Sequence, residues 1–159
     1  MDRLRDRFGF PGMRILQMAF GSDPKASEYL PHNYLRNGVV YTATHDHNTT
    51  VGWFTAEPGT QSTQGAAEIE AERAAARRYA NSDGREIHWD FIRLALGSVA
   101  AMAIFPLQDV LGLGTEARMN RPGSGAGNWA WRCLPDALGD APAERLAALT
   151  STYERNLET

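Results

Sequence analysis

Short apolar runs and longer stretches of helical periodicity alternate along the chain. The apolar runs are too short for helices and predict buried strands over residues 13–20, 38–44 and 101–111. The run over 38–44 contains no polar residue except threonine, a pattern typical of parallel strands covered on both faces. We also expect Met13 and Met18, in the first run, to fill the core.

Helical patterns separate these runs. They predict helices over residues 2–7, 48–56 and 66–79, one after Asp83, and one that starts near Asp140 or Pro142. Asp83 and Glu86 are three residues apart, which predicts a capping pair for the fourth helix. The core-facing positions we expect in the last two helices are Ile87, Phe91, Leu94, Leu146, Leu149 and Tyr153.

The alternation of strands and helices predicts an α/β fold with a parallel sheet. No internal repeat or linker divides the chain, so we expect residues 1–159 to form a single unit. Three strands are too few to close a barrel by themselves. The predicted sheet is therefore incomplete as a barrel.

Composition and charge argue against some kinds of binding partner and location. The net charge is −3 with both signs spread along the chain, which argues against nucleic acid or an anionic membrane as a partner. The longest apolar stretch, residues 94–105, is interrupted by Gly97 and Ser98 and falls short of the roughly 20 residues that cross a bilayer. A single cysteine, Cys133, and a charged N-terminus without an apolar signal core predict a cytoplasmic protein.

The richest candidate chemistry follows the second predicted strand, where the apolar run ends in His45 and Asp46. An Asp in this position either caps the following helix or points its carboxylate into a cleft at the carboxyl ends of the strands. His45 and His47 also have a metal-ligand spacing, but the sequence offers no clear third ligand nearby.

A second polar loop, residues 118–123, follows the third predicted strand and ends in a Pro-Gly turn. It is either only a turn or the neighbour of Asp46, with the Asn120 amide facing a hydroxylated ligand. Trp129 and Trp131 lie just beyond, either in the core or as surfaces on which sugar rings stack.

Six segments, in this order, resemble the C-terminal part of the 4-alpha-glucanotransferases, also called amylomaltases or disproportionating enzymes. The resemblance covers about residues 4 to 150. Its segments are DRFGFPGM (6–13), LPHNY (30–34), YTATHD (41–46), TTVGW (49–53), PLQD (106–109), and RMN (118–120) continuing to NWAWR (128–132). The resemblance implies the closing part of a (β/α)₈ TIM barrel of the α-amylase type.

The activity implied by the resemblance is retaining transfer of an α-1,4-glucan segment between maltodextrins, without a cofactor or metal. Such chemistry needs a nucleophilic carboxylate and an acid/base carboxylate about 5–5.5 Å apart. In the family both precede the segment that this chain resembles. The resemblance makes Asp46 the transition-state stabiliser, His45 a sugar-binding residue, and Asn120 and Asp23 residues that line the substrate cleft. His47 stands where the family often has Asn, beside the catalytic loop, and we expect this difference to alter contacts with the acceptor sugar.

We therefore expect the isolated chain to be inactive, since the nucleophile and acid/base have no counterpart in it. One alternative is a non-catalytic module that binds maltodextrin or joins a separate chain carrying the missing strands. The other is a metal-dependent hydrolase that uses His45, Asp46 and His47.

Overall fold

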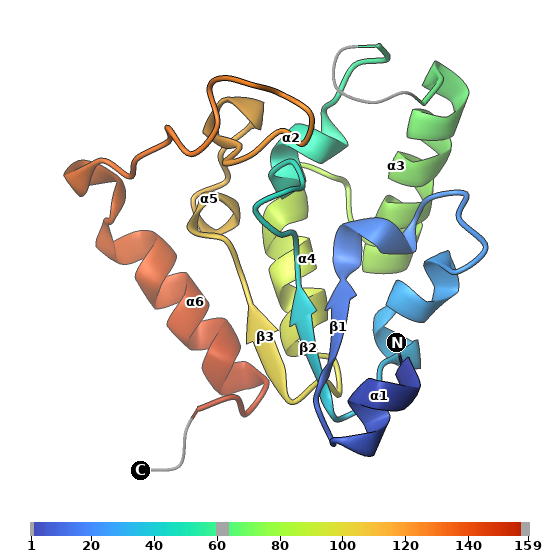
Figure 1. Cartoon of the computed structure of the whole chain (residues 1–159). Helices are drawn as coiled ribbons and strands as arrows, with labels where there is room; N and C mark the ends of the chain where they lie inside the picture. The colour runs from blue at the N-terminus through green and yellow to red at the C-terminus, as the bar shows by residue number, and fades with distance from the viewer. Residues whose placement is uncertain (1, 60–63, 157–159) are drawn as a thin grey trace.

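The computed structural model describes residues 2–59 and 64–156. Its centre is a parallel sheet of β1 (Gly12–Ile15), β2 (Gly38–Tyr41) and β3 (Met102–Ile104), in that order (Figure 1). Val39 is in register with Met13 on one side and Met102 on the other. The predicted α/β class with a parallel sheet is confirmed.

The strands are shorter than the apolar runs that predicted them. After Ile15 the chain turns into a 3₁₀ helix, Leu16–Ala19, and after Pro106 it forms α5 (Leu107–Val110). In the second run the strand pairing stops at Tyr41, and Thr42 donates its hydroxyl to the buried Asp109. An apolar run continues wherever the chain stays buried, so its length does not show where the strand pairing stops.

The predicted helices are present. They are α1 (Asp2–Arg7), α2 (Thr50–Phe54), α3 (Ala66–Ala80), α4 (Ile87–Leu96) and α6 (Asp140–Thr152). The predicted capping pair of α4 is wrong. The Asp83 carboxylate accepts from the backbone N–H of Arg85, and the Glu86 carboxylate pairs with Arg145 of α6 instead.

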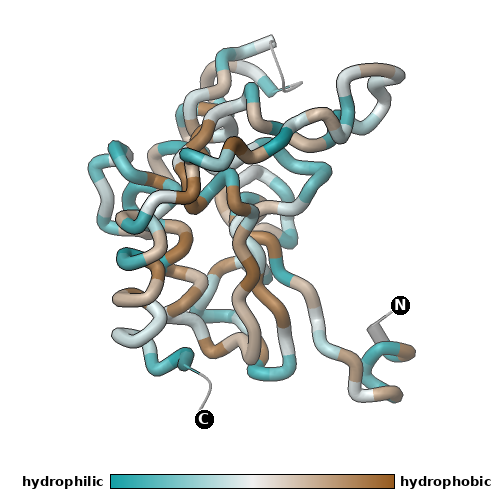
Figure 2. The backbone as a smooth tube through the Cα atoms, turned by 90° about the vertical axis from the view of Figure 1, so that its left-hand side faces the viewer, coloured by the Kyte–Doolittle hydropathy of each residue, from teal (hydrophilic) through white to brown (hydrophobic). Residues whose placement is uncertain are grey.

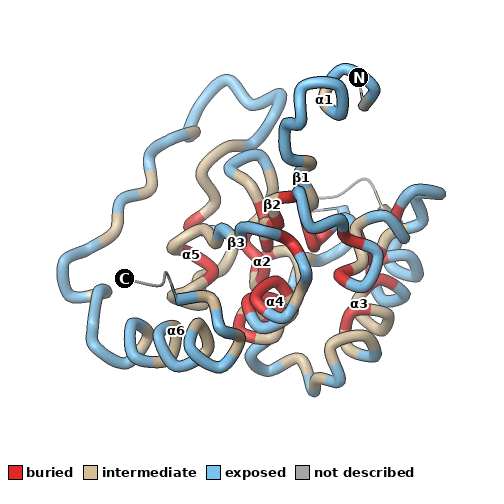
Figure 3. The backbone as a smooth tube through the Cα atoms, turned by 90° about the horizontal axis from the view of Figure 1, so that it is seen from below, coloured by how far each residue is buried: buried red, intermediate tan, exposed pale blue. Residues whose placement is uncertain are grey.

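The core lies between the sheet and α4, which runs behind the strands in Figure 1. Ala95 of α4 packs there against Val40 of β2. Ile87 and Phe91 are buried next to this region, against Leu16 and Phe20 of the segment after β1, and Leu94 packs against the same cluster, which confirms the predicted core-facing positions. Leu146 and Leu149 of α6, with Tyr153 directly after it, pack against the opposite side of α4. In Figure 3 buried residues gather on the strands and α4, whereas α1 and much of α6 are exposed.

The two faces of the sheet have different surroundings. Val40 faces α4 and is fully buried, whereas Met13 and Met102 on the opposite face are each 53% exposed. Among the described residues no helix covers that second face, so the prediction of cover on both faces is wrong. Met13 and Met18 are also exposed, contrary to the core role we predicted. Hydrophobic residues nevertheless run through the centre of the molecule, and α1 stands apart from it (Figure 2).

Among the helices in residues 2–59 and 64–156, none combines the length and the apolar character needed to cross a membrane.

Candidate active site

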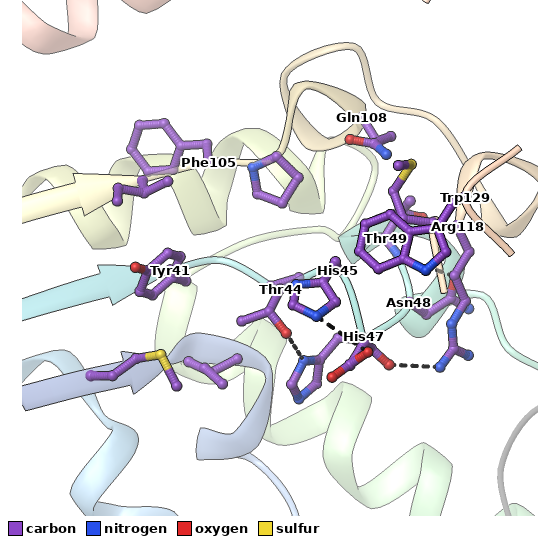
Figure 4. Close-up of a pocket in the computed structure, with 17 residues that line it drawn as sticks. Tyr41, Thr44, His45, His47, Asn48, Thr49, Phe105, Gln108, Arg118 and Trp129 are labelled. Carbon is purple, nitrogen blue, oxygen red and sulfur yellow. Dashed lines mark hydrogen bonds and ion pairs between the residues drawn. The ribbon is translucent and has the colours of Figure 1, made fainter. Parts of the chain in front are cut away.

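A cleft of about 620 Å³ opens where the carboxyl ends of the three strands meet. Its floor is apolar and comes from the uncovered sheet face, with Ile15, Tyr41 and Ile104 among the lining residues. Its rim is polar and comes from two loops, residues 44–49 and 118–129 (Figure 4). Active sites of barrel enzymes lie at this end of the strands because each strand delivers a loop there.

Asp46 lies on the rim with its side chain 48% exposed. Its Oδ1 accepts a hydrogen bond of 2.6 Å from Nδ2 of Asn120 and lies 3.4 Å from Nε2 of His45. Thr49, not Asp46, caps the following helix, since its hydroxyl accepts from the backbone N–H of Gly52. The helix-cap alternative for Asp46 is therefore wrong, and its carboxylate borders the cleft.

The two polar loops are hydrogen-bonded to each other through their backbones. The Asn120 N–H donates to the carbonyl of His45 at 3.1 Å, and the Arg118 guanidinium donates to the carbonyl of Asp46 at 2.8 Å. Within its own loop the same guanidinium donates to the carbonyl of Asn120 at 2.8 Å. The predicted proximity of Asn120 to Asp46 is present in the structure. Arg118, which we did not predict, precedes Asn120 by two residues in the same motif, and that motif was the available signal.

Trp129 lies on the rim beside His45, with ring centroids 5.2 Å apart (Figure 4). The residue is 52% exposed, and its backbone has a φ of 60°, which is strained for a bulky side chain. A hydrogen bond from its N–H to the carbonyl of Met119 holds this conformation. Of the two tryptophans, Trp129 lines the cleft and Trp131 is half-buried outside it.

His47 turns its ring back onto its own loop. Its Nδ1 lies 2.7 Å from the hydroxyl of Thr44. Burial lowers the pKa of His47, opposed by the neighbouring Asp46, and so favours the neutral form of the ring. Within residues 2–59 and 64–156, no cluster of three or more His, Cys, Asp or Glu side chains is placed to hold a metal ion.

Two of the predicted site residues, Asn120 and Asp23, are not among the residues that line the cleft. Asn120 nevertheless contacts a lining residue, since its amide donates to Asp46. Asp23 has no such contact among the described residues. Its carboxylate accepts from the N–H of Lys25 at 2.7 Å and so stabilises its own turn. A contact between Asp23 and substrate stays a prediction.

The comparisons with known proteins agree on one family. A model of the 4-alpha-glucanotransferase family matches residues 1–136. The chain belongs to the 4-alpha-glucanotransferase family. It is 48% identical to a 4-alpha-glucanotransferase of Synechocystis over 99% of this chain, and 45% identical to one of Thermus thermophilus over 98% of it. It spans only 29% and 30% of the length of those two glucanotransferases.

A solved amylomaltase has the same fold over this region. The amylomaltase from Streptococcus agalactiae, in complex with acarbose, superposes with a TM-score of 0.84 at 30% identity, covering 98% of this chain and 30% of that one. The three strands and their helices are thus a partial barrel of the glucanotransferase type, as predicted.

Proposed function

We propose that this chain supplies the transition-state-stabilising carboxylate, Asp46, of a retaining 4-alpha-glucanotransferase. The observation that carries the proposal is the placement of Asp46 at the rim of the cleft, where Asn120 and His45 both contact its Oδ1. Among the described residues both contacts are to Oδ1, so Oδ2 is proposed to accept from the hydroxyls of a sugar.

The proposed role follows from the charge that develops during glycosyl transfer. The sugar ring flattens and becomes oxocarbenium-like, and a fixed carboxylate that accepts from its hydroxyls binds this state more tightly than the ground state. Asn120 holds the Asp46 carboxylate with a donated hydrogen bond, so little reorganisation is needed as charge develops. The substrate is proposed to be maltodextrin or another α-1,4-glucan.

The nucleophile and the acid/base are proposed to come from barrel strands that precede the region matched by this chain. Transfer by the isolated chain is therefore expected to be absent. We test this by incubating the chain with maltotriose, alone and with a separately produced N-terminal portion of a relative's barrel, and by measuring glucose and longer dextrins.

With the complementing portion, we expect activity in the wild type and a loss of about 10²- to 10³-fold in Asp46→Asn, the range seen when one transition-state contact is removed. Asp83→Asn, an exposed Asp with no place in the cleft, is the matched control and should keep its activity. Strong transfer by the chain alone would contradict the proposed inactivity. Full activity of Asp46→Asn would contradict the role of Asp46.

A second candidate function, a maltodextrin-binding module without catalysis, is favoured by the exposed Trp129 beside His45 in the cleft. Stacking on a sugar ring would change the fluorescence of this indole. Titration of the isolated chain with maltoheptaose or acarbose should then give a saturable change that Trp129→Ala abolishes. If the isolated chain binds these sugars and the complemented chain still transfers no glucan, this function would be favoured over the first.

No group of ligands within the described residues favours the metal-dependent hydrolase. The cytoplasmic location also stays a proposal, because the related potato protein is named as chloroplastic or amyloplastic.

A further inference from the structure

Asp109 of α5 is a fully buried carboxylate that does not line the cleft. Three donors converge on it. The hydroxyl of Thr42 donates to Oδ2 at 2.5 Å, the hydroxyl of Thr50 donates to Oδ2 at 2.9 Å, and the backbone N–H of Thr50 donates to Oδ1 at 2.7 Å.

The two threonines bracket the loop that carries the site. Thr42 directly follows β2, and Thr50 is the first residue of α2. The segment between them, residues 43–49, contains His45 and Asp46. One carboxylate on a different element therefore fixes both ends of the loop that places Asp46 at the rim.

We propose that Asp109 is a positioning residue for Asp46, an inference that rests on the proposed function. It is buried and outside the cleft lining, so it acts through the 43–49 loop and does not contact a sugar. Its effect on catalysis is the fixed placement of the Asp46 carboxylate relative to the Asn120 amide.

Further hydrogen bonds join the 43–49 loop to the chain that follows Asp109. The Asn48 amide donates to the hydroxyl of Thr115 at 2.9 Å, and the Asn120 N–H donates to the carbonyl of His45 at 3.1 Å. Gln108, the neighbour of Asp109, donates to the carbonyl of Ala117 at 3.2 Å and so holds the second loop against α5. The order of the 43–49 loop thus depends on the chain from Gln108 to Asn120.

The chemistry of the three donors explains why a carboxylate stands at this position. An ionised carboxylate accepts all three hydrogen bonds at once, whereas an alanine would leave two hydroxyls and one backbone N–H buried without an acceptor. Burial raises the pKa of Asp109, and the hydrogen bonds from Thr42 and Thr50 oppose that rise. An asparagine would keep the shape, since the hydroxyls can rotate to accept from its amide.

The experiment measures amide hydrogen exchange in the isolated chain, so it does not need catalysis. In Asp109→Ala we expect the amides of His47, Thr50 and Asn120 to exchange about 10- to 100-fold faster, which corresponds to losing a hydrogen bond to a charged group. Amides of α6 should not change beyond the shift in global stability.

The matched control is Ile92→Ala, which removes a buried side chain from the α4 face that packs against α6. It lowers global stability without touching the 43–49 loop. Asp109→Asn should restore much of the protection that Asp109→Ala removes. If Asp109→Ala does not fold, Thr42→Val, which removes one donor at nearly constant volume, should still raise exchange in the loop.

Acceleration confined to the loop, with rescue by Asn, is the expected result. Faster exchange spread evenly over the chain, as expected for Ile92→Ala, would overturn the proposal. Unchanged exchange in the 43–49 loop would overturn it as well. In the complemented enzyme Asp109→Ala should lower kcat with little change in KM. If Asp46→Asn leaves complemented activity intact while the loop exchange behaves as expected, the proposed function fails but the link between Asp109 and the loop stands.

Discussion

At the scale of single residues, Gly52 shows how closely the site loop packs. A Cβ added there would lie 2.5 Å from Oδ1 of Asn48 and 2.6 Å from the hydroxyl of Thr115. The Asn48 oxygen accepts from the backbone N–H of Thr49, and the Thr115 hydroxyl accepts from the Asn48 amide, so both atoms belong to the hydrogen bonds that order the site loop. We expect Gly52→Ala to lower the free energy of unfolding by about 1–3 kcal/mol, as overpacking does.

Urea unfolding measures this loss, with Gly125→Ala as the control. A Cβ at Gly125 has nothing within 4 Å, so that variant should stay within about 0.5 kcal/mol of the wild type. Equal effects of the two variants would mean that the packing around Gly52 is loose.

His88 carries a pH dependence of stability. Burial lowers its pKa, and its buried Nδ1 has no hydrogen-bond partner among the described residues. In the unfolded chain His88 takes up a proton as the pH falls through about 6.5, whereas the folded chain resists it. Stability should therefore fall as the pH drops below about 6.5, by at most about 1.4 kcal/mol per pH unit from this residue.

Urea unfolding of the wild type and His88→Gln between pH 8 and 5 checks this prediction. The variant should lose less stability toward acid. Asp109 contributes in the opposite sense, because its raised pKa makes stability fall as the pH rises through its folded value. The charges of His88 and Asp109 also act on each other's pKa, so the difference between the two pH curves reports His88 together with its effect on Asp109. Parallel curves would contradict the prediction.

At the scale of elements, Arg155 fastens the end of α4 to the segment after α6. Its guanidinium donates to the carbonyl of Leu96 at 3.0 Å, to that of Ala100 at 2.6 Å, and to that of Ser98. Helix C-termini leave carbonyls without intrahelical partners, and a planar guanidinium reaches several of them at once. A lysine ammonium is a single point and does not match this geometry.

We expect Arg155→Lys to cost about 1–3 kcal/mol of unfolding free energy, because it leaves carbonyls of the α4 end without their donor. Arg85→Lys is the control, since that side chain is 88% exposed and makes only a surface ion pair with Asp83. Thermal unfolding should show a clear loss for the first variant and almost none for the second. Similar melting temperatures for the wild type and the two variants would contradict a stabilising role of the Arg155 hydrogen bonds.

At the scale of the whole molecule, the sheet has one packed face and one face that borders the cleft. Val40 is buried against Ala95 and Ala100, whereas Met102 on the neighbouring strand is 53% exposed on the other face. We expect Val40→Thr to cost about 1–3 kcal/mol, because it buries a hydroxyl at constant volume. Met102→Thr should stay within about 0.5 kcal/mol in the isolated chain.

Urea unfolding of both variants tests this asymmetry. A large loss in Met102→Thr would mean that its face is packed in solution, for example by a second copy of the chain. Under the proposed function the same variant should weaken complementation, because this apolar face would then meet the rest of the barrel.

The sequence by itself determined the class of fold, the order of its elements and the family. Apolar runs and helical periods are local properties, so they indicated the three strands and the core stripes of α4 and α6. The segment ending in Asp46 was recognisable because an apolar strand stops at a carboxylate, and the ordered motifs assigned it to the glucanotransferases.

Only the tertiary structure decided which atoms meet. The pairing of Asp46 with Asn120, 74 residues apart, and the burial of Asp109 between Thr42 and Thr50 depend on how separate loops pack at one end of the sheet. The pattern of apolar residues also did not predict that one face of the sheet is uncovered. Apolar residues signal removal from water, but they do not say which neighbour removes them from it.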